Sequence, residues 1–334
     1  MSLTPDPSRY VFRGLHPRLH LGTASDRYAG WIGQIYTPGR YEGRIQRRTK
    51  RLAGQRFTEE VLPVESVAEY FEHFDLLEID YTFYAPLLEV DGRPTPTLRV
   101  LRRYAEFAPA GAGFVLKAPQ MFFAQKLLTG GRYVSNESYL DAEGFRRRFW
   151  EPAEGLLGPA LRAVVFEQEY QRSRNREPPE RVAEGLDRFF SALPPTGRFH
   201  VELRTEAYLS APVLEVLAAH GVGQVLSHWT WLPPLRVQWA RGGRRVRSGS
   251  GWQILRLMTP RGVRYEEAYA RAFPFDRMVE GMMTPGMVED AVRISREAIE
   301  RGAEVGVIVN NRAGGNAPEI ARRIAEAWLA EGGI

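Results

Sequence analysis

The chain lacks several residue types and patterns that mark common protein classes. It contains no cysteine, which excludes disulfides, thiol nucleophiles and thiolate-bound metals. It has only 6 histidines and no H-E-x-x-H pair, so a multi-zinc centre is not expected. No apolar run approaches the roughly 18 residues of a membrane span, and the first residues, MSLTPDPSRYVFRG, lack the apolar segment of a signal peptide. We therefore expect a cytoplasmic protein that does not associate with a membrane.

Two sequence signatures of well-known enzyme folds are missing as well. No serine or threonine lies in a nucleophile-elbow pattern, which argues against serine hydrolase chemistry. No G-x-G-x-x-G fingerprint follows the first strand-like run, which argues against an open dinucleotide-binding sheet.

Strand-like apolar runs alternate with helical segments along the whole chain of 334 residues. The hydrophobic content of 44% and the charged content of 25% are typical of a globular protein with a sizeable core. The expected strands cover residues 19–23, 76–80, 113–117, 162–167, 199–203, 223–227, 252–257 and 305–310. The expected helices cover residues 66–74, 97–107, 142–150, 179–192, 211–220, 287–301 and 317–331. Alternation of this kind implies parallel pairing, and eight such units close most economically as a barrel. We predict a single domain over residues 1–334, an α/β protein with a (β/α)8 TIM-type barrel and long βα loops.

Most of the expected strands end in a polar or charged residue, and these residues form the candidate site. In a closed α/β barrel the strand ends meet at one mouth, where groups from several strands come together. A general acid/base role suits Asp80, Glu167 and Glu202, whereas Lys117 and Arg256 can hold an anionic group. The expected catalytic residues are Asp80, Lys117, Glu167 and Glu202, and the expected substrate-binding residues are Tyr28, Trp31, Thr82, Tyr84, Gln168, Arg204, His228, Arg256, Asn310 and Asn311.

The same pattern also has a purely structural interpretation. Strand alternation puts Glu78 and Asp80 on one face of a strand, and Glu202 and Arg204 on one face of another. If both faces point inward, these charges can form buried ion pairs that only balance one another. The aromatic residues near the strand ends can likewise stack a base or a sugar, or can simply cover the barrel core.

Basic residues concentrate in two segments, although the net charge of the chain is only +5. Residues 40–56 contain seven basic side chains opposed by Glu42 alone, and residues 236–247 contain five arginines and no acid. We interpret both segments as basic loop insertions on the rim of the barrel, suited to phosphate or another polyanion. The alternative is a pair of solvated loops that have no partner.

Five short pieces of the sequence occur in an order that is typical of one protein family. They are Leu21-Gly22-Thr23-Ala24-Ser25 through Tyr28-Ala29-Gly30-Trp31, Glu78-Ile79-Asp80-Tyr81-Thr82-Phe83-Tyr84, Phe114-Val115-Leu116-Lys117-Ala118-Pro119, Val201-Glu202-Leu203-Arg204, and Asn310-Asn311 before Asn316-Ala317. In these pieces, which bracket the chain from about residue 19 to residue 328, the protein resembles the domain-of-unknown-function-72 (YecE-like) family. The resemblance implies a (β/α)8 barrel, loosely similar to the endonuclease IV and xylose isomerase barrels, and it implies no established activity.

The chain departs from the family pattern at positions that matter for chemistry. Asp80-Tyr81 stands where the family usually has Asn-Ser, so a carboxylate replaces an amide. Arg256-Leu257-Met258-Thr259 resembles a family Arg-Leu-His-Gly strand but lacks its histidine. Either Glu167 or Gln168 takes the position of a family glutamine. The chain is therefore a divergent member, and its chemistry need not follow that of its relatives.

Two functional classes remain open. The first is an enzyme, a hydrolase or lyase, that acts at the C-terminal mouth of the barrel on a phosphate-bearing or otherwise anionic substrate, nucleic acid included. The second is a non-catalytic module that binds nucleic acid or another polyanion on the same rim. The metal ion that the sequence leaves open is Mg²⁺ or Mn²⁺, held by Asp80, Glu167 and Glu202 together with waters. The sequence does not indicate the oligomeric state.

Overall fold

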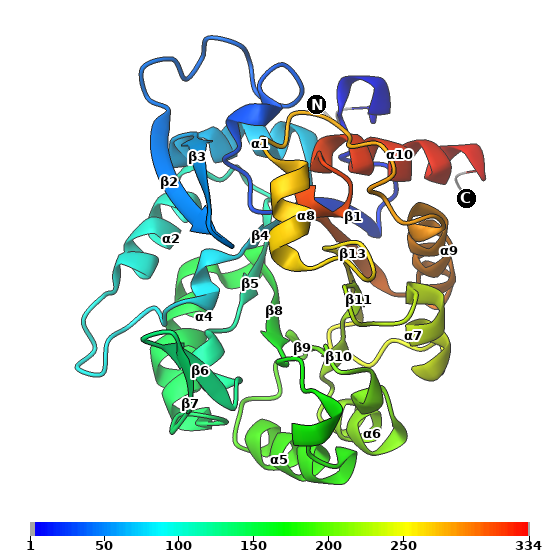
Figure 1. Cartoon of the computed structure of the whole chain (residues 1–334). Coiled ribbons are helices and arrows are strands. Elements are labelled where there is room, and N and C mark those ends of the chain that lie inside the picture. Colours follow the sequence, from blue (N-terminus) through cyan, green and yellow to red (C-terminus); the bar gives the residue numbers. More distant parts are fainter. Residues whose placement is uncertain (1–3, 333–334) are drawn as a thin grey trace.

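Parallel strands close into a barrel at the centre of the molecule (Figure 1). The computed structural model describes residues 4–332. Around the barrel the strands follow the order β10-β9-β8-β5-β4-β1-β13-β12-β11. Their bounds are β1 Leu19–Ala24, β4 Leu76–Ile79, β5 Gly113–Lys117, β8 Leu161–Glu167, β9 Phe199–Glu202, β10 Gly223–Gln224, β11 Leu226–His228, β12 Trp252–Leu257 and β13 Glu304–Val309. This arrangement confirms the predicted (β/α)8 TIM-type barrel.

The barrel closes at its sixth strand, which is interrupted at Val225 and so consists of β10 and β11. The first piece pairs with β9 and the second with β12. Side-chain amides bridge the interruption, because Gln253 Nε2 donates to the carbonyl of Gln224 at 2.9 Å. Gln238 in turn donates to the carbonyl of Ser227 at 2.8 Å and accepts from its N–H at 3.1 Å. These amides satisfy backbone groups that the sheet leaves unpaired.

Helices surround the barrel on its outer side (Figure 1). Their bounds are α1 Val67–His73, α2 Pro96–Phe107, α3 Ala142–Phe145, α4 Glu151–Leu157, α5 Pro179–Ser191, α6 Ala211–Ala219, α7 Leu235–Arg241, α8 Tyr265–Ala272, α9 Met287–Glu300 and α10 Ala317–Ala330. Each expected helix is present, and the one expected at 142–150 continues through a π-helical turn, Arg146–Trp150, into α4. Within residues 4–332 none of the helices combines the length and the apolar character that crossing a membrane requires.

Two apolar cores lie on opposite faces of the barrel sheet. Leu21, Leu116 and Val201 point outward and pack in the core that also contains the helix side chains. Val115 and Ile254 belong to a smaller cluster inside the barrel. Because successive strand residues point to opposite faces, this division also decides which polar side chains face the interior.

Gly22 on β1 shows how little room the barrel interior offers. A Cβ atom at this position would lie 2.3 Å from the carbonyl oxygen of Leu76 on the neighbouring strand β4. Only glycine permits this close approach of two strands.

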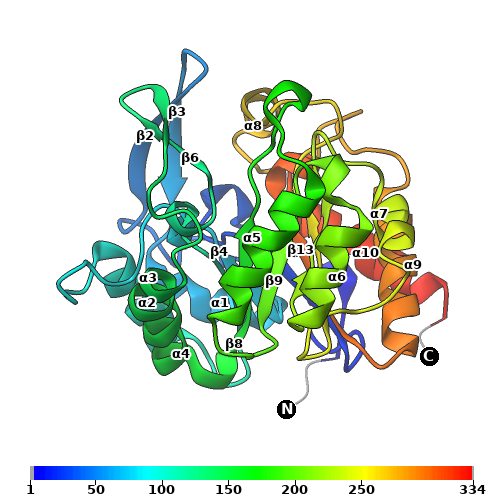
Figure 2. The ribbon, with the colours of Figure 1, turned by 90° about the horizontal axis from the view of Figure 1, so that it is seen from below.

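Two β-hairpins extend beyond the C-terminal ends of the barrel strands, on the same side as α8 (Figure 2). One consists of β2 Gln46–Leu52 and β3 Gln55–Val61, and the other of β6 Lys126–Thr129 and β7 Arg132–Ser135. The basic segment 40–56 therefore folds largely as a hairpin rather than as the expected loop. Cross-strand pairs such as Arg47 with Glu60 explain the difference, because the acids that accompany the basic strand lie on the following strand.

The expectation of a basic loop at 236–247 is wrong for the first half of that segment. Residues 235–241 form α7, which packs Leu235 and Trp239 into the outer core. The chain then continues to a turn at the N-terminal end of the barrel, where the N–H of Gly249 donates to the carbonyl of Gly221, just before β10. This second basic segment consequently runs away from the mouth.

Candidate functional site

Charged side chains from several strands meet inside the C-terminal mouth of the barrel. The register pairs Glu167 at the end of β8 with Glu202 at the end of β9. Alternation turns both side chains, and also Arg256 of β12, toward the interior. We call the group the barrel charge cluster, and its members are Glu78, Lys117, Glu167, Glu202, Arg204 and Arg256.

Arg256 is the centre of this cluster and is almost completely buried. Its Nε and Nη2 atoms donate to the two carboxylate oxygens of Glu78, both at 2.7 Å, which is bidentate pairing. Its Nη1 atom donates to Glu167 Oε1 at 2.9 Å and also to Glu202 Oε2. One guanidinium therefore joins three strands across the interior.

Lys117 and Arg204 form the upper layer of the cluster. Lys117 Nζ lies 2.8 Å from Glu167 Oε1, and Arg204 Nη2 lies 2.8 Å from the same oxygen and 3.0 Å from Glu202 Oε2. Aromatic rings flank both cations, since Lys117 lies 4.2 Å from the ring centroid of Phe83 and Arg204 4.3 Å from that of Trp229. The cluster thus contains three carboxylates and three cations, and its formal charge is zero.

Burial and pairing act in opposite directions on the pKa values of the cluster. Burial alone would raise the pKa of Glu167, but Arg204, Lys117 and Arg256 outweigh burial and the pKa is lowered. Burial would lower the pKa of Arg256, but the carboxylates of Glu202, Glu78 and Glu167 raise it well above its ordinary value. Glu167 consequently stays ionised, which suits a partner of cations better than a proton donor.

Arg312 reaches the mouth from the segment that follows β13. Its guanidinium carbon lies 4.4 Å from the ring centroid of Tyr265, and its Nε atom is buried without a hydrogen-bond partner. Throughout residues 4–332 no carboxylate lies within 4 Å of its guanidinium nitrogens. The sequence pattern indicates no role for Arg312, although it directly follows Asn310-Asn311 and so carries the same strand-end signal.

Glu78 is expected from strand alternation to face inward, but the sequence alone does not indicate its pairing with Arg256.

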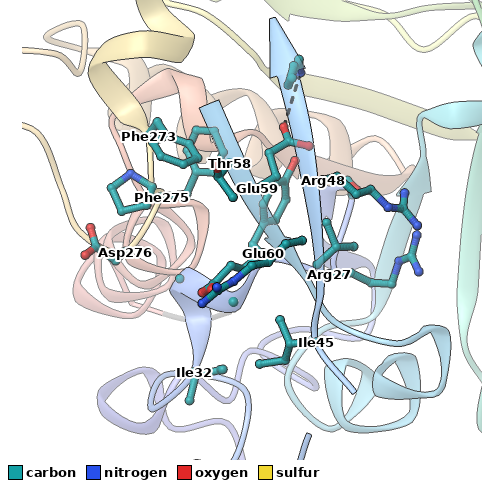
Figure 3. Close-up of a pocket in the computed structure, with 18 of the residues that line it drawn as sticks. Arg27, Ile32, Ile45, Arg48, Thr58, Glu59, Glu60, Phe273, Phe275 and Asp276 are labelled. Carbon is teal, nitrogen blue, oxygen red and sulfur yellow. Dashed lines mark hydrogen bonds and ion pairs between the residues drawn. The ribbon is translucent and has the colours of Figure 1, made fainter. Parts of the chain in front are cut away.

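A cleft of about 820 Å³ opens beside the mouth, between the β2–β3 hairpin and residues 273–276 (Figure 3). We call it the hairpin cleft. Asp80, Tyr84 and Tyr28 line it on the side of the barrel. Asp80 has no ion-pair partner within 4 Å in the described part of the chain, and its carboxylate does not cap the turn that follows β4. Tyr84 is 72% exposed.

Three of the expected substrate-binding residues instead hold the end of β13 in place. Trp31 Nε1 donates to Asn311 Oδ1 at 3.1 Å, and the N–H of Ala317 donates to the same oxygen at 2.8 Å. Asn310 Oδ1 accepts from the N–H of Arg312 at 3.0 Å. Because all three side chains are buried, they orient the backbone that carries Arg312.

Two further expected residues position the cations of the cluster. Thr82 Oγ1 donates to the carbonyl of Lys117 at 2.8 Å and accepts from its N–H at 3.1 Å. Gln168 Oε1 accepts from the N–H groups of Arg204 and Thr205 at 3.2 and 3.1 Å. Both side chains are buried and act through the backbone of the adjacent strand end.

The structure does not bring His228 to the cluster. Alternation along β11 puts its side chain on the same face as Leu226, which packs in the outer core. Burial lowers the pKa of His228 to about 4, so the ring is neutral at physiological pH. In the described residues neither of its ring nitrogens has a hydrogen-bond partner.

Much of the positive charge in the two basic segments is paired. In the first, the pairs are Arg40–Glu69, Arg44–Glu65, Arg47–Glu60 and Lys50–Glu59. In the second, the pairs are Arg236–Asp290, Arg241–Glu206 and Arg244–Glu297. The hairpin is near the mouth, whereas Arg247 of the second segment contacts Gln224 of β10, in the first piece of the sixth strand. A rim with both basic segments at the mouth is therefore not formed.

The arrangement of carboxylates does not fit a metal ion. Within residues 4–332 no group of three or more histidine, aspartate or glutamate side chains lies close enough to ligate one. Glu167 and Glu202 are engaged by arginine and lysine nitrogens, and Asp80 alone lacks such a partner. The proposed Mg²⁺ or Mn²⁺ set of Asp80, Glu167 and Glu202 would require these ion pairs to break.

Comparison with protein families identifies one match that covers nearly the whole chain. The profile of the family described as "Protein of unknown function DUF72" matches residues 20–333. No curated protein matches the sequence.

Solved structures from two bacteria are similar to this chain. A DUF72 family protein of Thermotoga maritima is similar with a TM-score of 0.56 and 15% sequence identity, over 93% of this chain and 99% of that one. A DUF72 family protein of Enterococcus faecalis is similar with a TM-score of 0.53 and 16% identity, over 93% of this chain and 95% of that one. At this level of identity the likeness concerns the fold alone.

Proposed function

The chain belongs to the DUF72 family of proteins of unknown function, and we propose that it is an enzyme acting on a phosphate-bearing or otherwise anionic substrate at the mouth of its barrel. The observation that carries this proposal is the layering of charge. The side chains of Lys117 and Arg204 are 13% and 17% exposed, whereas the carboxylates beneath them are at most 2% exposed. A ligand that enters the mouth consequently meets cations first.

Arg312 adds a third cation to this surface. Its charge has no carboxylate within 4 Å in the described residues, and its contact with Tyr265 leaves its donors available. A planar guanidinium can bind two oxygens of a phosphate or carboxylate at once. Lys117, Arg204 and Arg312 together would hold one anionic group above a cluster that is itself neutral.

Asp80 is the carboxylate best suited to proton transfer. It lines the hairpin cleft next to the mouth and has no ion-pair partner among the residues described. Glu167 and Glu202, by contrast, are held by cations and would orient Lys117 and Arg204. We therefore assign the general acid/base role to Asp80 and a positioning role to the two glutamates.

Titration calorimetry with inorganic phosphate tests the binding part of this proposal. We expect saturable binding by the native protein and at least tenfold weaker binding by Arg312→Gln, because one charge-assisted hydrogen bond contributes roughly 1.5–3 kcal/mol. Arg245→Gln is the control, since Arg245 is an exposed arginine of the second basic segment, away from the mouth. Absence of saturable binding, or equal losses in both variants, would exclude a phosphate site at the mouth.

The catalytic part needs a separate measurement. We expect Asp80→Asn to bind phosphate at least as well as the native protein, because it removes a nearby negative charge, and to lose turnover of phosphorylated compounds. Undiminished turnover in Asp80→Asn would remove its acid/base role. A protein that binds single-stranded DNA but turns over no phosphorylated compound would instead be the alternative, a non-catalytic module for nucleic acid.

A further inference from the structure

The hairpin cleft contains two further cations that form no ion pair in the described part of the chain. Arg27 and Arg48 both line it, and within residues 4–332 neither has a carboxylate within 4 Å. The other basic residues of the cleft are paired, Arg47 with Glu60 at 3.0 Å and Lys50 with Glu59 at 3.6 Å. Figure 3 shows Arg27 and Arg48 extending toward the same side of the cleft, with Phe273, Phe275 and Asp276 on the other side.

Uncharged groups fix the two arginines. Arg27 lies where the segment after β1 joins the edge of β3: its carbonyl accepts from the N–H of Leu62 at 3.1 Å, and Tyr28 pairs with Val61. The Arg27 guanidinium donates to the carbonyl of Leu62 at 3.4 Å, and that of Arg48 donates to Gln46 Oε1 at 3.2 Å. These bonds orient both groups without neutralising their charge, which leaves that charge available to an anion.

Asp80 and Tyr84 connect the hairpin cleft with the mouth. Both line the cleft. The ring of Tyr84 also lies 5.5 Å from that of Phe83, which contacts Lys117 in the mouth with its ring centroid 4.2 Å from Lys117 Nζ. A ligand can therefore extend from the upper layer of the barrel charge cluster past Asp80 into the cleft.

We propose that the substrate carries two separate anionic groups, one held by Lys117, Arg204 and Arg312 and the other by Arg27 and Arg48. This inference rests on the proposed function and narrows its substrate class to bisphosphates and short phosphate-linked chains. Asp80 lines the cleft and directly precedes the turn whose Thr82 bonds to the backbone of Lys117, so it would face the part of the substrate that joins the two groups. A single phosphate would fill only one position.

Calorimetry with fructose 6-phosphate and fructose 1,6-bisphosphate tests the inference, because the two sugars differ by one distal phosphate. We expect the bisphosphate to bind at least tenfold more tightly to the native protein. In Arg48→Gln this advantage should fall to less than threefold, while the affinity for the monophosphate stays within twofold of native. The dinucleotide pTpT, used in parallel, distinguishes a phosphate-linked chain from a sugar bisphosphate by which of the two binds more tightly.

Arg51→Gln is the matched control. Arg51 is exposed on the same strand, β2, but does not line the cleft, so its replacement should change neither affinity. Because Arg48 and Arg51 are both exposed, neither change threatens the fold, which a thermal melt of each variant checks.

The outcomes separate the two proposals. Equal affinities of the native protein for the mono- and bisphosphate would overturn the second anion position but leave the mouth site standing. If Arg48→Gln lost affinity equally for the monophosphate and the bisphosphate, there would be a single anion position, in the cleft. That result would also overturn the inference. If no phosphate compound bound at all, the phosphate site of the proposed function would fail together with this inference.

Discussion

Arg256 shows most directly how single residues stabilise the interior of this barrel. Its guanidinium is 2% exposed and contacts Glu78, Glu167 and Glu202. A buried ion pair contributes little compared with apolar packing, but removal of one partner leaves charges that neither water nor a counterion compensates.

We therefore expect Arg256→Met to lower the free energy of unfolding by about 3–5 kcal/mol, measured by urea denaturation. Arg181→Met is the control, because Arg181 and its partner Glu184 are 72% and 51% exposed. An exposed pair of this kind contributes less than about 1 kcal/mol. A loss for Arg256→Met no larger than that of the control would mean that the three glutamates do not depend on the Arg256 guanidinium.

Asp26 is a second residue whose environment has a measurable consequence. It is 1% exposed, its Oδ1 accepts from the hydroxyl of Tyr104 at 2.6 Å, and its Oδ2 has no hydrogen-bond partner. Burial raises its pKa from the ordinary 3.8 to about 6, against the opposing effect of Arg27. Because the folded state holds the proton more tightly, this group stabilises the protein below about pH 4, and that contribution is lost as the pH rises through 6.

Asp26→Asn should abolish this dependence on pH. The shift corresponds to about 3 kcal/mol, so we expect the variant to exceed the native protein in unfolding free energy by up to that amount at pH 7.5, and to show no such gain at pH 4. Urea denaturation at several pH values measures the difference. Asp91→Asn, in an exposed pair with Arg93, is the control and should change stability equally at both pH values. A gain for Asp26→Asn that is independent of pH would contradict the assignment.

The charged residues of the interior could be predicted from alternation, but their pairing could not. Alternation along the strands predicts that Glu78, Glu202 and Arg256 face one interior, and the structure agrees. Whether such a group is a site or a set of balanced ion pairs depends on distances across the barrel, which follow from register. The buried hydrogen bond between Trp31 and Asn311 could not be predicted for the same reason, because it joins residues 280 positions apart.

At the scale of elements, the β2–β3 hairpin is the part that adds most to the mouth, and aromatic contacts attach it to the barrel. A two-stranded hairpin is marginal on its own. This one packs Phe57 against α8 and the following residues, with ring centroids 5.1 Å from Tyr269 and 5.3 Å from Phe273. Lys50 adds a cation–π contact, 4.2 Å from the ring of Tyr269.

We expect Phe57→Ala to free the hairpin without unfolding the barrel. Hydrogen exchange of residues 46–61 should become at least tenfold faster, because the contact that orders the strands is lost. Exchange in β8 and β13 should not change. The control is Thr58→Ala, which alters the adjacent residue but removes no aromatic contact. If exchange accelerated equally throughout the barrel, the hairpin would have to be part of the global folding unit.

Helix α7 illustrates why a short element can escape sequence analysis. Its seven residues supply only Leu235 and Trp239 at apolar i, i+4 spacing, within a stretch rich in proline, glycine and arginine. Tertiary contacts stabilise it instead: the side chain of Gln238 bonds to the backbone of Ser227, and Trp239 Nε1 donates to Glu297 at 2.8 Å. Longer helices such as α9 and α10 were predicted because their periodicity extends over several turns.

At the scale of the whole molecule, topology rather than composition decides where positive charge acts. The net charge of +5 does not tell on which side of the barrel the positive charge lies. Because each crossover returns the chain to the N-terminal end of the barrel, a basic segment that follows a helix lies far from the mouth, as Arg247 does. Strand β1 has 6 residues, so the two ends are separated by about 20 Å, more than two Debye lengths at physiological salt.

Single-stranded DNA tests this asymmetry, because it binds any accessible set of unpaired cations. We expect weak binding at low salt through the mouth side alone, with about three phosphate contacts and a slope near −2 in log affinity against log salt.

The double variant Arg27→Gln/Arg48→Gln should flatten that slope by about 1.4, since each lost contact contributes roughly 0.7. Arg244→Asn/Arg245→Gln removes the same number of charges from the second basic segment and should leave the slope unchanged. Asparagine suits position 244, where the backbone φ is 51°. Equal flattening of the salt slope by the two variants would mean that a polyanion wraps around the barrel. The mouth would then not be the preferred binding site.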